Sequence, residues 1–159
     1  MSMRHAVLAV AVAVLLGAVS APAAADEVAV IVNKSNPVNT LSMVQLRKIM
    51  LAQEVKWPTG SRIVVWMTPP GQRERAAMLK IVCGMSETDF TLHFMHASFN
   101  GEIADLPKTA ASGALVRQLV AGAVNGLALI LASQADDTVK VLTIEGNSPG
   151  QAAYRLIVK

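Results

Sequence analysis

Residues 28–60 read VAVIVNKSNPVNTLSMVQLRKIMLAQEVKWPTG, and this stretch decides the fold class. The run at residues 28–32 is entirely Val, Ala and Ile, which predicts a strand that is buried on both faces. The turn-forming run NKSNP follows it and ends the strand. Ser42 and Gln45 then form the pattern of a capping box, so we expect a helix over residues 42–52.

The same alternation of strand and helix patterns continues along the chain. A wholly apolar run at residues 127–131 is typical of a central strand. Strands that alternate with helices indicate a mostly parallel sheet covered on both faces, so the sequence predicts an α/β fold, a three-layer sandwich. Besides the elements already named, we expect strands over residues 62–67, 139–144 and 153–158 and helices over residues 72–82, 86–98 and 110–121.

Residues 1–25 have the pattern of a secretory signal peptide. Arg4 and His5 supply a basic start, residues 6–19 contain only Ala, Val, Leu and Gly, and the following SAPAAA offers the small residues that signal peptidase accepts. The apolar run is shorter than the roughly 20 residues that span a bilayer. We expect cleavage before Asp26 and a periplasmic location, with an uncleaved anchor as the alternative.

The predicted mature part, residues 26–159, is expected to be one domain with a nearly balanced charge. Removing Arg4 from the 14 Lys and Arg leaves 13 against 11 Asp and Glu, a net charge of +2. This balance, together with the lack of a basic cluster interleaved with aromatic residues, argues against a nucleic-acid partner. Cys83 is the only cysteine, so no internal disulfide is expected, and we interpret it as a small buried residue at the end of a helix.

Several runs of the sequence together resemble one known family. They are VIVNKSNPV at residues 30–38, LSMVQLRKIML at residues 41–51, WPTG at residues 57–60 and, more weakly, VNGLAL at residues 124–129. They resemble the second lobe of PstS-like phosphate-binding proteins, and the resemblance covers about residues 28–131. It implies one lobe of a type 2 periplasmic binding protein, which serves an ABC transporter as its substrate-binding component.

Two departures from that family change what the resemblance implies. Full-length members have two lobes that close on the ligand, whereas residues 26–159 supply about one. Members also carry a Gly-Ser-Gly-Thr-type segment at the start of the anion-binding helix, where this chain has PGQRER at residues 70–75. We therefore expect a lobe that offers an open surface and not an enclosed pocket.

The candidate ligand residues lie at the start of the helix predicted over residues 72–82 and in the turn after the first strand. A glycine lets the chain approach a ligand closely, and the unpaired N–H groups and dipole of a helix start favour an anion. Arginine can hold phosphate or carboxylate through two parallel hydrogen bonds. The alternatives are a solvated helix start and a turn that only caps its strand. The predicted set is Ser35, Asn36, Gly71, Gln72, Arg73 and Arg75.

Other side chains that carry chemistry give weaker signals. Asp89, His93 and His96 fall on one face of a predicted helix, a spacing that could share a metal. No fourth ligand follows, so we interpret the two histidines as part of a partly exposed helix face and predict neither metal nor cofactor. The sequence has no nucleophile elbow, zinc-protease, P-loop or dinucleotide motif, which argues against an enzyme; a hydrolase with an unrecognised site is the alternative.

The sequence therefore predicts an exported periplasmic solute-binding domain, with phosphate or another small oxyanion as ligand and an ABC transporter as partner. The alternative is a ligand-free periplasmic interaction module that docks on a transporter, a sensor or a receptor. A homodimer that covers the open face of the lobe is a further possible partner arrangement.

Overall fold

The computed structural model describes residues 26–158, so the predicted signal peptide lies outside the described residues. No helix in this part of the chain is long and apolar enough to cross a membrane. In chain order the elements are β1 (Val28–Asn33), β2 (Thr40–Leu41), α1 (Met43–Met50), β3 (Val64–Met67), α2 (Arg73–Ala77), the π-helix η1 (Met78–Cys83), α3 (Glu87–Phe99), β4 (Lys108–Thr109), α4 (Gly113–Gly122), β5 (Gly126–Leu131), the 3-10 helix η2 (Ala132–Gln134), β6 (Val139–Val141) and β7 (Thr143–Ile144).

The main sheet has five strands in the order β4-β3-β5-β1-β6. β3 runs parallel to β4 and to β5, whereas β1 runs antiparallel to both of its neighbours, β5 and β6. Four of the five strands therefore point the same way, and β1 is the exception. The predicted mostly parallel sheet is confirmed, and the apolar strand β5 lies at its centre.

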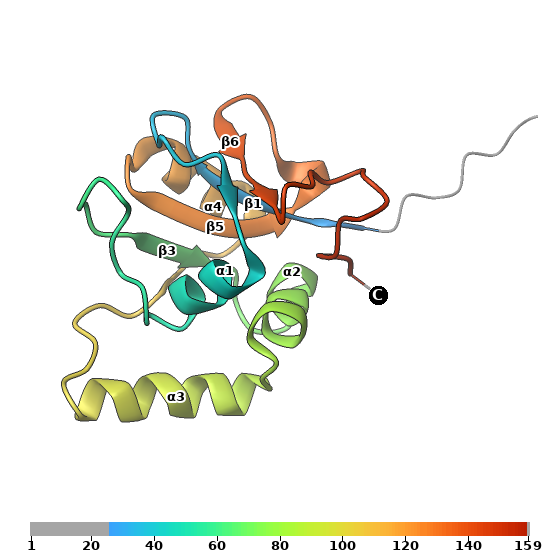
Figure 1. Cartoon of the computed structure of the whole chain (residues 1–159). Coiled ribbons are helices and arrows are strands. Elements are labelled where there is room, and N and C mark those ends of the chain that lie inside the picture. Colours follow the sequence, from blue (N-terminus) through green and yellow to red (C-terminus); the bar gives the residue numbers. More distant parts are fainter. Residues whose placement is uncertain (1–25, 159) are drawn as a thin grey trace, which may run out of the picture.

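Helices cover both faces of this sheet (Figure 1). On one face Val30 and Val32 of β1 pack in the larger core together with side chains of α1, α2, η1 and α3. On the other face Ile31 packs in a smaller core against Val116 and Val120 of α4. The predicted three-layer α/β sandwich is confirmed.

Two helices begin at the capping boxes that the sequence predicts. At α1 the Ser42 Oγ accepts a hydrogen bond from the Gln45 N–H at 3.1 Å, and the Gln45 Oε1 accepts one from the Ser42 N–H at 2.9 Å. Ser86 and Asp89 form the same reciprocal pair at α3. Each box satisfies N–H groups that have no partner within the helix, so these local residues fix where the helix starts.

The helix predicted over residues 72–82 consists of α2 and η1 in direct succession. In a π-helix the hydrogen bonds join residues five apart, and such residues share a face. Met78 and Cys83 are five apart, and their sulfur atoms lie 3.5 Å from each other in the buried core. Cys83 is therefore a buried residue at a helix end, as predicted, and burial raises the pKa of its thiol to about 11, against a smaller opposing effect of Arg47.

The C-terminal part differs from the prediction in two places. The strand predicted over residues 139–144 is divided into β6, in the main sheet, and β7, which pairs in parallel with β2. The strand predicted over residues 153–158 is wrong, because only an isolated bridge joins Ile157 to Glu27. Hydrogen bonds from the Val28 N–H to the Leu156 carbonyl and from the Val158 N–H to the Asp26 carbonyl flank this bridge, and the pairing extends no further among the described residues.

A hydrogen bond from Tyr154 connects the C-terminal segment to β1. Its hydroxyl donates to the Val28 carbonyl oxygen at 2.6 Å, and the side chain is buried. Burial raises the pKa of Tyr154 well above its ordinary value, and the nearby Glu27 raises it further. The folded state therefore favours the protonated phenol.

We predict that ionisation of Tyr154 and alkaline unfolding occur together. An unfolded tyrosine ionises near pH 10, so the stability that the protonated phenol contributes is complete below about pH 10 and is lost as the pH rises further. Because Tyr154 is the only tyrosine, absorbance at 295 nm reports its ionisation, and circular dichroism reports unfolding. A phenolate that appears near pH 10 in a folded protein contradicts the prediction.

The variant Tyr154→Phe is the matched control. It keeps the ring but removes the hydroxyl, so we expect the free energy of unfolding at pH 7 to fall by about 1 to 2 kcal/mol. The part of the stability loss above pH 10 that belongs to Tyr154 should disappear in this variant.

Candidate functional site

The carboxyl ends of β3, β4 and β5 meet at one edge of the sheet. The loop at residues 68–72 leads from β3 into α2, the loop at residues 110–112 leads from β4 into α4, and η2 follows β5. β1 runs the other way, so its first residues lie at this edge too, and α2 stands beside them (Figure 1). In open α/β sheets, ligands bind outside the carboxyl ends of the strands, and this edge is the candidate site.

Thr68 is the first residue after β3, and it has an unusual environment. Its side chain is 1% exposed, and its Oγ1 has no hydrogen-bond partner within residues 26–158. A buried hydroxyl without a partner costs roughly 1 to 3 kcal/mol compared with a paired one, so such groups call for a functional or structural reason. The loop then turns at Gly71, whose φ of +91° is a left-handed conformation that glycine adopts without strain.

The start of α2 has no side-chain cap, whereas the start of α4 has one. Gln72 is the N-cap of α2 and makes no side-chain capping bond, so no side chain there satisfies the first N–H groups of the helix. At α4 the Ser112 Oγ accepts from the Leu115 N–H at 3.2 Å. Arg73, in the first turn of α2, is half-exposed and forms an ion pair with Asp26.

Arg75 connects two segments of the chain at this edge, the loop after β3 and the start of α3. Its side chain is 9% exposed, and its Nε donates to both carboxylate oxygens of Glu87, at 3.1 and 2.9 Å. Its Nη1 donates to the Thr68 carbonyl at 2.8 Å, and the guanidinium lies 5.9 Å from the centre of the Phe90 ring. The guanidinium thus joins the loop after β3 to the start of α3. These contacts occupy the Arg75 guanidinium, which was predicted from the sequence to bind a ligand.

Ser35 and Asn36 lie at the opposite end of the sheet from Gly71. They follow the carboxyl end of β1, and β1 runs against β5 and thus against β3. The Ser35 N–H donates to the Asn33 Oδ1 at 2.9 Å, and the buried Asn36 Oδ1 accepts from the Val38 N–H at 2.9 Å. These bonds stabilise the turn.

The six predicted ligand residues therefore do not form one site. Gly71, Gln72 and Arg73 share the open carboxyl edge, and Arg75 is buried behind it. The direction of β1 separates Ser35 and Asn36 from this group.

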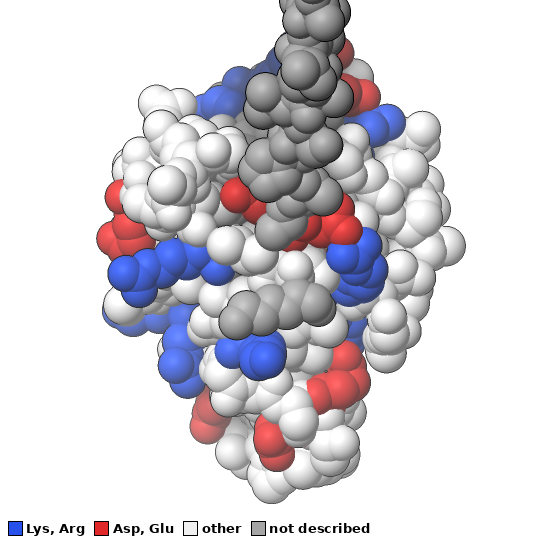
Figure 2. Space-filling view, turned by 90° about the vertical axis from the view of Figure 1, so that its right-hand side faces the viewer, with Lys and Arg blue, Asp and Glu red and all other residues white. Residues whose placement is uncertain are grey.

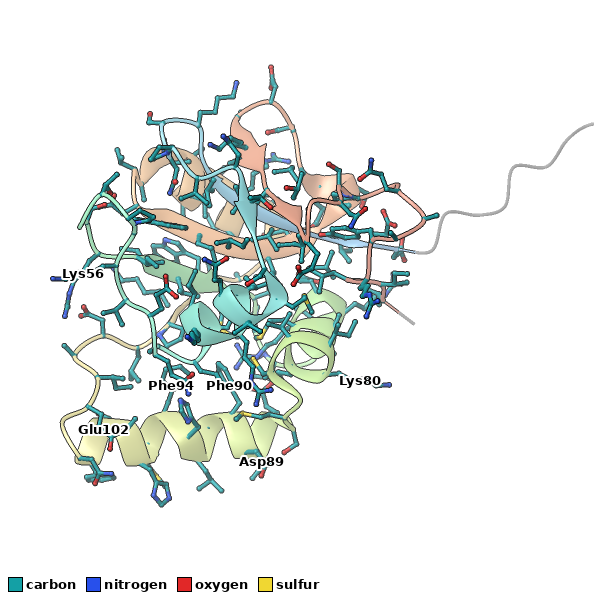
Figure 3. All side chains as sticks on the ribbon, in the orientation of Figure 1. Lys56, Lys80, Asp89, Phe90, Phe94 and Glu102 are labelled. Carbon is teal, nitrogen blue, oxygen red and sulfur yellow. The ribbon has the colours of Figure 1, made fainter. Side chains whose placement is uncertain are left out.

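Of the three residues with metal-ligand spacing on α3, Asp89 and His93 have other contacts and His96 is exposed. The Asp89 carboxylate accepts from the Ser86 hydroxyl at 2.7 Å as part of the capping box, and the His93 Nε2 lies 3.0 Å from the Leu51 carbonyl oxygen. Within the described range, no group of three or more His, Cys, Asp or Glu side chains is placed to hold a metal. Figure 3 shows Asp89 at the start of α3, directed away from the sheet.

Sequence reasoning missed an apolar hollow of about 460 Å³ between α3 and the β3–β4 edge. Phe90 and Phe94 point from α3 into the space beside the body of the protein (Figure 3), with ring centres 4.8 Å apart in an edge-to-face arrangement. Met95 and Phe99 line the hollow further along, and Phe99 is 85% exposed. Phe90 with Phe94, and Met95 with Phe99, are each four positions apart, and this spacing was the signal that could have revealed it.

No protein-family model matches the sequence, and no curated protein matches it. Solved structures do match the fold. A structure from Clostridium perfringens, described as a phosphate ABC transporter substrate-binding protein with bound phosphate, has a TM-score of 0.65 and 25% identity over 79% of this chain and 48% of that one. An ABC-type phosphate transport receptor from Vibrio cholerae has a TM-score of 0.65, 22% identity and coverage of 79% and 49%. PstS from Borrelia burgdorferi has a TM-score of 0.63, 10% identity and coverage of 79% and 50%.

This chain has the fold of one PstS-like lobe. The resemblance to PstS-like proteins is confirmed, and the chain spans about half the length of the solved structures that it matches. The first two of these structures are described as transport components, and neither is described as an enzyme.

In this PstS-like lobe we predict that the geometry of Arg75, and not only its charge, is required for stability. Arg75→Lys keeps the charge but loses the two-pronged contact with Glu87 and the bond to the Thr68 carbonyl, so the free energy of unfolding should fall by about 1 to 3 kcal/mol. Arg73→Lys is the matched control, and its exposed pair with Asp26 should change stability by less than about 0.5 kcal/mol. Equal effects of the two changes in urea unfolding would contradict the assignment.

Proposed function

We propose that the chain is an extracytoplasmic solute-binding lobe that holds a small oxyanion, phosphate or a close relative, at the start of α2. The observation that carries the proposal is the open start of α2 beside the buried, unpartnered hydroxyl of Thr68. The C. perfringens structure of the same fold is described with bound phosphate, which supports the choice of ligand class.

This edge offers hydrogen-bond donors, as an oxyanion requires, and also one buried carboxylate, that of Glu74 in the first turn of α2, which opposes an anion. The first N–H groups of α2 and the Thr68 hydroxyl can each donate, and the helix dipole places partial positive charge there. Arg73 adds a full positive charge, which its pair with Asp26 partly offsets. We therefore expect this lobe on its own to bind the anion specifically but weakly, because it contacts the anion from one side.

A transporter is the partner that this function requires. The V. cholerae structure is described as a phosphate transport receptor, and we propose that this lobe likewise delivers its ligand to an ABC transporter. Export through the signal peptide predicted over residues 1–25 would place the lobe where such a transporter collects its substrate.

The second candidate function is a ligand-free interaction module. A specific observation favours it: Leu92, Met95, Phe99 and Leu106 leave a group of exposed apolar side chains around α3. Such groups mark protein contacts more often than isolated exposed residues do. In this alternative, the face around α3 docks on a transporter, a sensor or a receptor.

Phosphate titration by calorimetry tests the proposed function. We expect heat of binding at millimolar phosphate, measured at constant ionic strength with chloride as the comparison anion. Gln72→Glu places a negative charge at the N-cap of α2, where it stabilises the helix but repels the ligand, so affinity should fall about tenfold. Gln53→Glu carries the same charge change on an exposed residue after α1 and should leave the affinity unchanged.

Two results would contradict the proposal. One is the absence of any heat with phosphate, sulfate and arsenate for the unchanged protein, which would favour the interaction module. The other is an equal loss of affinity in Gln72→Glu and Gln53→Glu, which would show that phosphate responds only to net charge.

A further inference from the structure

A groove of about 450 Å³ lies between the flank of α2 and the C-terminal segment, on the side of the molecule that faces the viewer in Figure 2. Its volume falls within the roughly 300 to 1,000 Å³ that is usual for small-molecule sites. Ala77 and Ile81 line it from the helical side, and Ile157 and Val158 line it from the opposite side. The last three of these are half-buried, so the floor of the groove is aliphatic and accessible.

Hydrogen bonds to the start of β1 hold the C-terminal wall of the groove in place. The Val158 N–H donates to the Asp26 carbonyl at 2.7 Å, and the Val28 N–H donates to the Leu156 carbonyl at 2.8 Å. The wall is therefore anchored to the most buried strand of the sheet, which favours a preformed groove.

Among residues 26–158, three cationic side chains line the groove and no acidic one does. They are Arg73, Lys80 and Arg155. Arg73 is paired with Asp26, whereas the ion pairs found between residues 26 and 158 involve neither Lys80 nor Arg155. Figure 3 shows Lys80 extending outward from η1, and in Figure 2 Lys and Arg side chains lie around the middle of this face together with Asp and Glu side chains.

The combination of an aliphatic floor and a cationic lining specifies the chemistry of a ligand. An aliphatic chain is favoured by the floor, where each methylene that becomes fully buried strengthens binding about fourfold. An anionic head is favoured by Lys80 and Arg155. Phosphate alone would leave the floor in contact with water, and a neutral alcohol would leave the two cations without a partner.

A peptide strand fits this groove less well than an amphiphile. Strand addition requires free N–H groups and carbonyls along an edge. At the C-terminal wall the Ile157 N–H donates to the Arg155 carbonyl and the Val158 N–H donates to the Asp26 carbonyl, so both donors are already used.

From this geometry we infer that the groove is a second binding site, for a carboxylate that carries an aliphatic chain. The chain lies along Ile81, Ile157 and Val158, and the carboxylate pairs with Lys80 and Arg155. This inference goes beyond the proposed oxyanion site, because neither Lys80 nor Arg155 belongs to the loop before α2.

Decanoate is the probe, titrated below its micelle concentration into the chain of residues 26–159, which contains the whole described domain. We expect saturable heat of binding, tighter for decanoate than for octanoate. Decanol and decyltrimethylammonium share the chain but lack the negative head, so both should bind at least tenfold more weakly. Binding of either one as tightly as decanoate overturns the inference, and so does the absence of decanoate binding.

Variants separate the groove from general charge effects. The double variant Lys80→Gln with Arg155→Gln should weaken decanoate at least tenfold. Lys56→Gln with Lys48→Gln removes the same charge elsewhere, since Lys56 lies on the opposite side of the molecule from Lys80 (Figure 3), and should leave decanoate affinity unchanged. Equal losses in the two double variants overturn the inference.

Phosphate titrations of the same variants keep the two proposals distinct. The double variant at Lys80 and Arg155 should retain phosphate binding, because the start of α2 is intact. If the unchanged protein binds phosphate but does not bind decanoate, the carboxylate site in the groove is refuted and the oxyanion site is not. Decanoate binding without phosphate binding refutes only the oxyanion site.

Discussion

The burial of β1 on both faces is the constraint on which the rest of the structure depends. Residues 28–32 have no exposed surface, so the strand requires a neighbour on each edge and a helical layer on each face. β1 is also the one strand of the main sheet that runs against the others. Its first residues therefore reach the edge where β3 and β5 end, and this brings Asp26 to Arg73 and the C-terminal segment to α2. The pair of Arg73 with Asp26 and the groove both follow from the direction of this one strand.

The elements that the sequence predicts correctly depend on residues only a few positions apart. Ser42 with Gln45, and Ser86 with Asp89, define their helix starts without help from the rest of the chain. The last segment, residues 153–158, has the apolar composition of a strand, but β5 occupies one edge of β1 and β6 occupies residues 31–33 of the other. It meets only the first residues of β1, so a bridge forms where a strand was predicted. Whether a strand has a free edge for a further partner depends on the whole sheet, so the residue pattern of a single segment cannot reveal it.

The site was predictable in part, for the same physical reason. Gly71, Gln72 and Arg73 lie at the open carboxyl edge because a loop between a parallel strand and its helix must end there. Arg73 and Arg75 look equivalent in the sequence, yet residues two apart on a helix face different ways. Arg75 faces α3 and meets Glu87, a contact that depends on how two helices pack. The separation of Ser35 and Asn36 from the other predicted ligand residues could not be foreseen, because the residue pattern of a buried strand does not reveal its direction.

Arg73 links the two proposed sites through a shared charge. It stands in the first turn of α2 and also lines the groove, and Asp26 already neutralises part of its charge. An oxyanion at the helix start and a carboxylate in the groove would both draw on this guanidinium. Two anions near one cation repel each other, so occupation of either site disfavours the other by the same free energy in both directions.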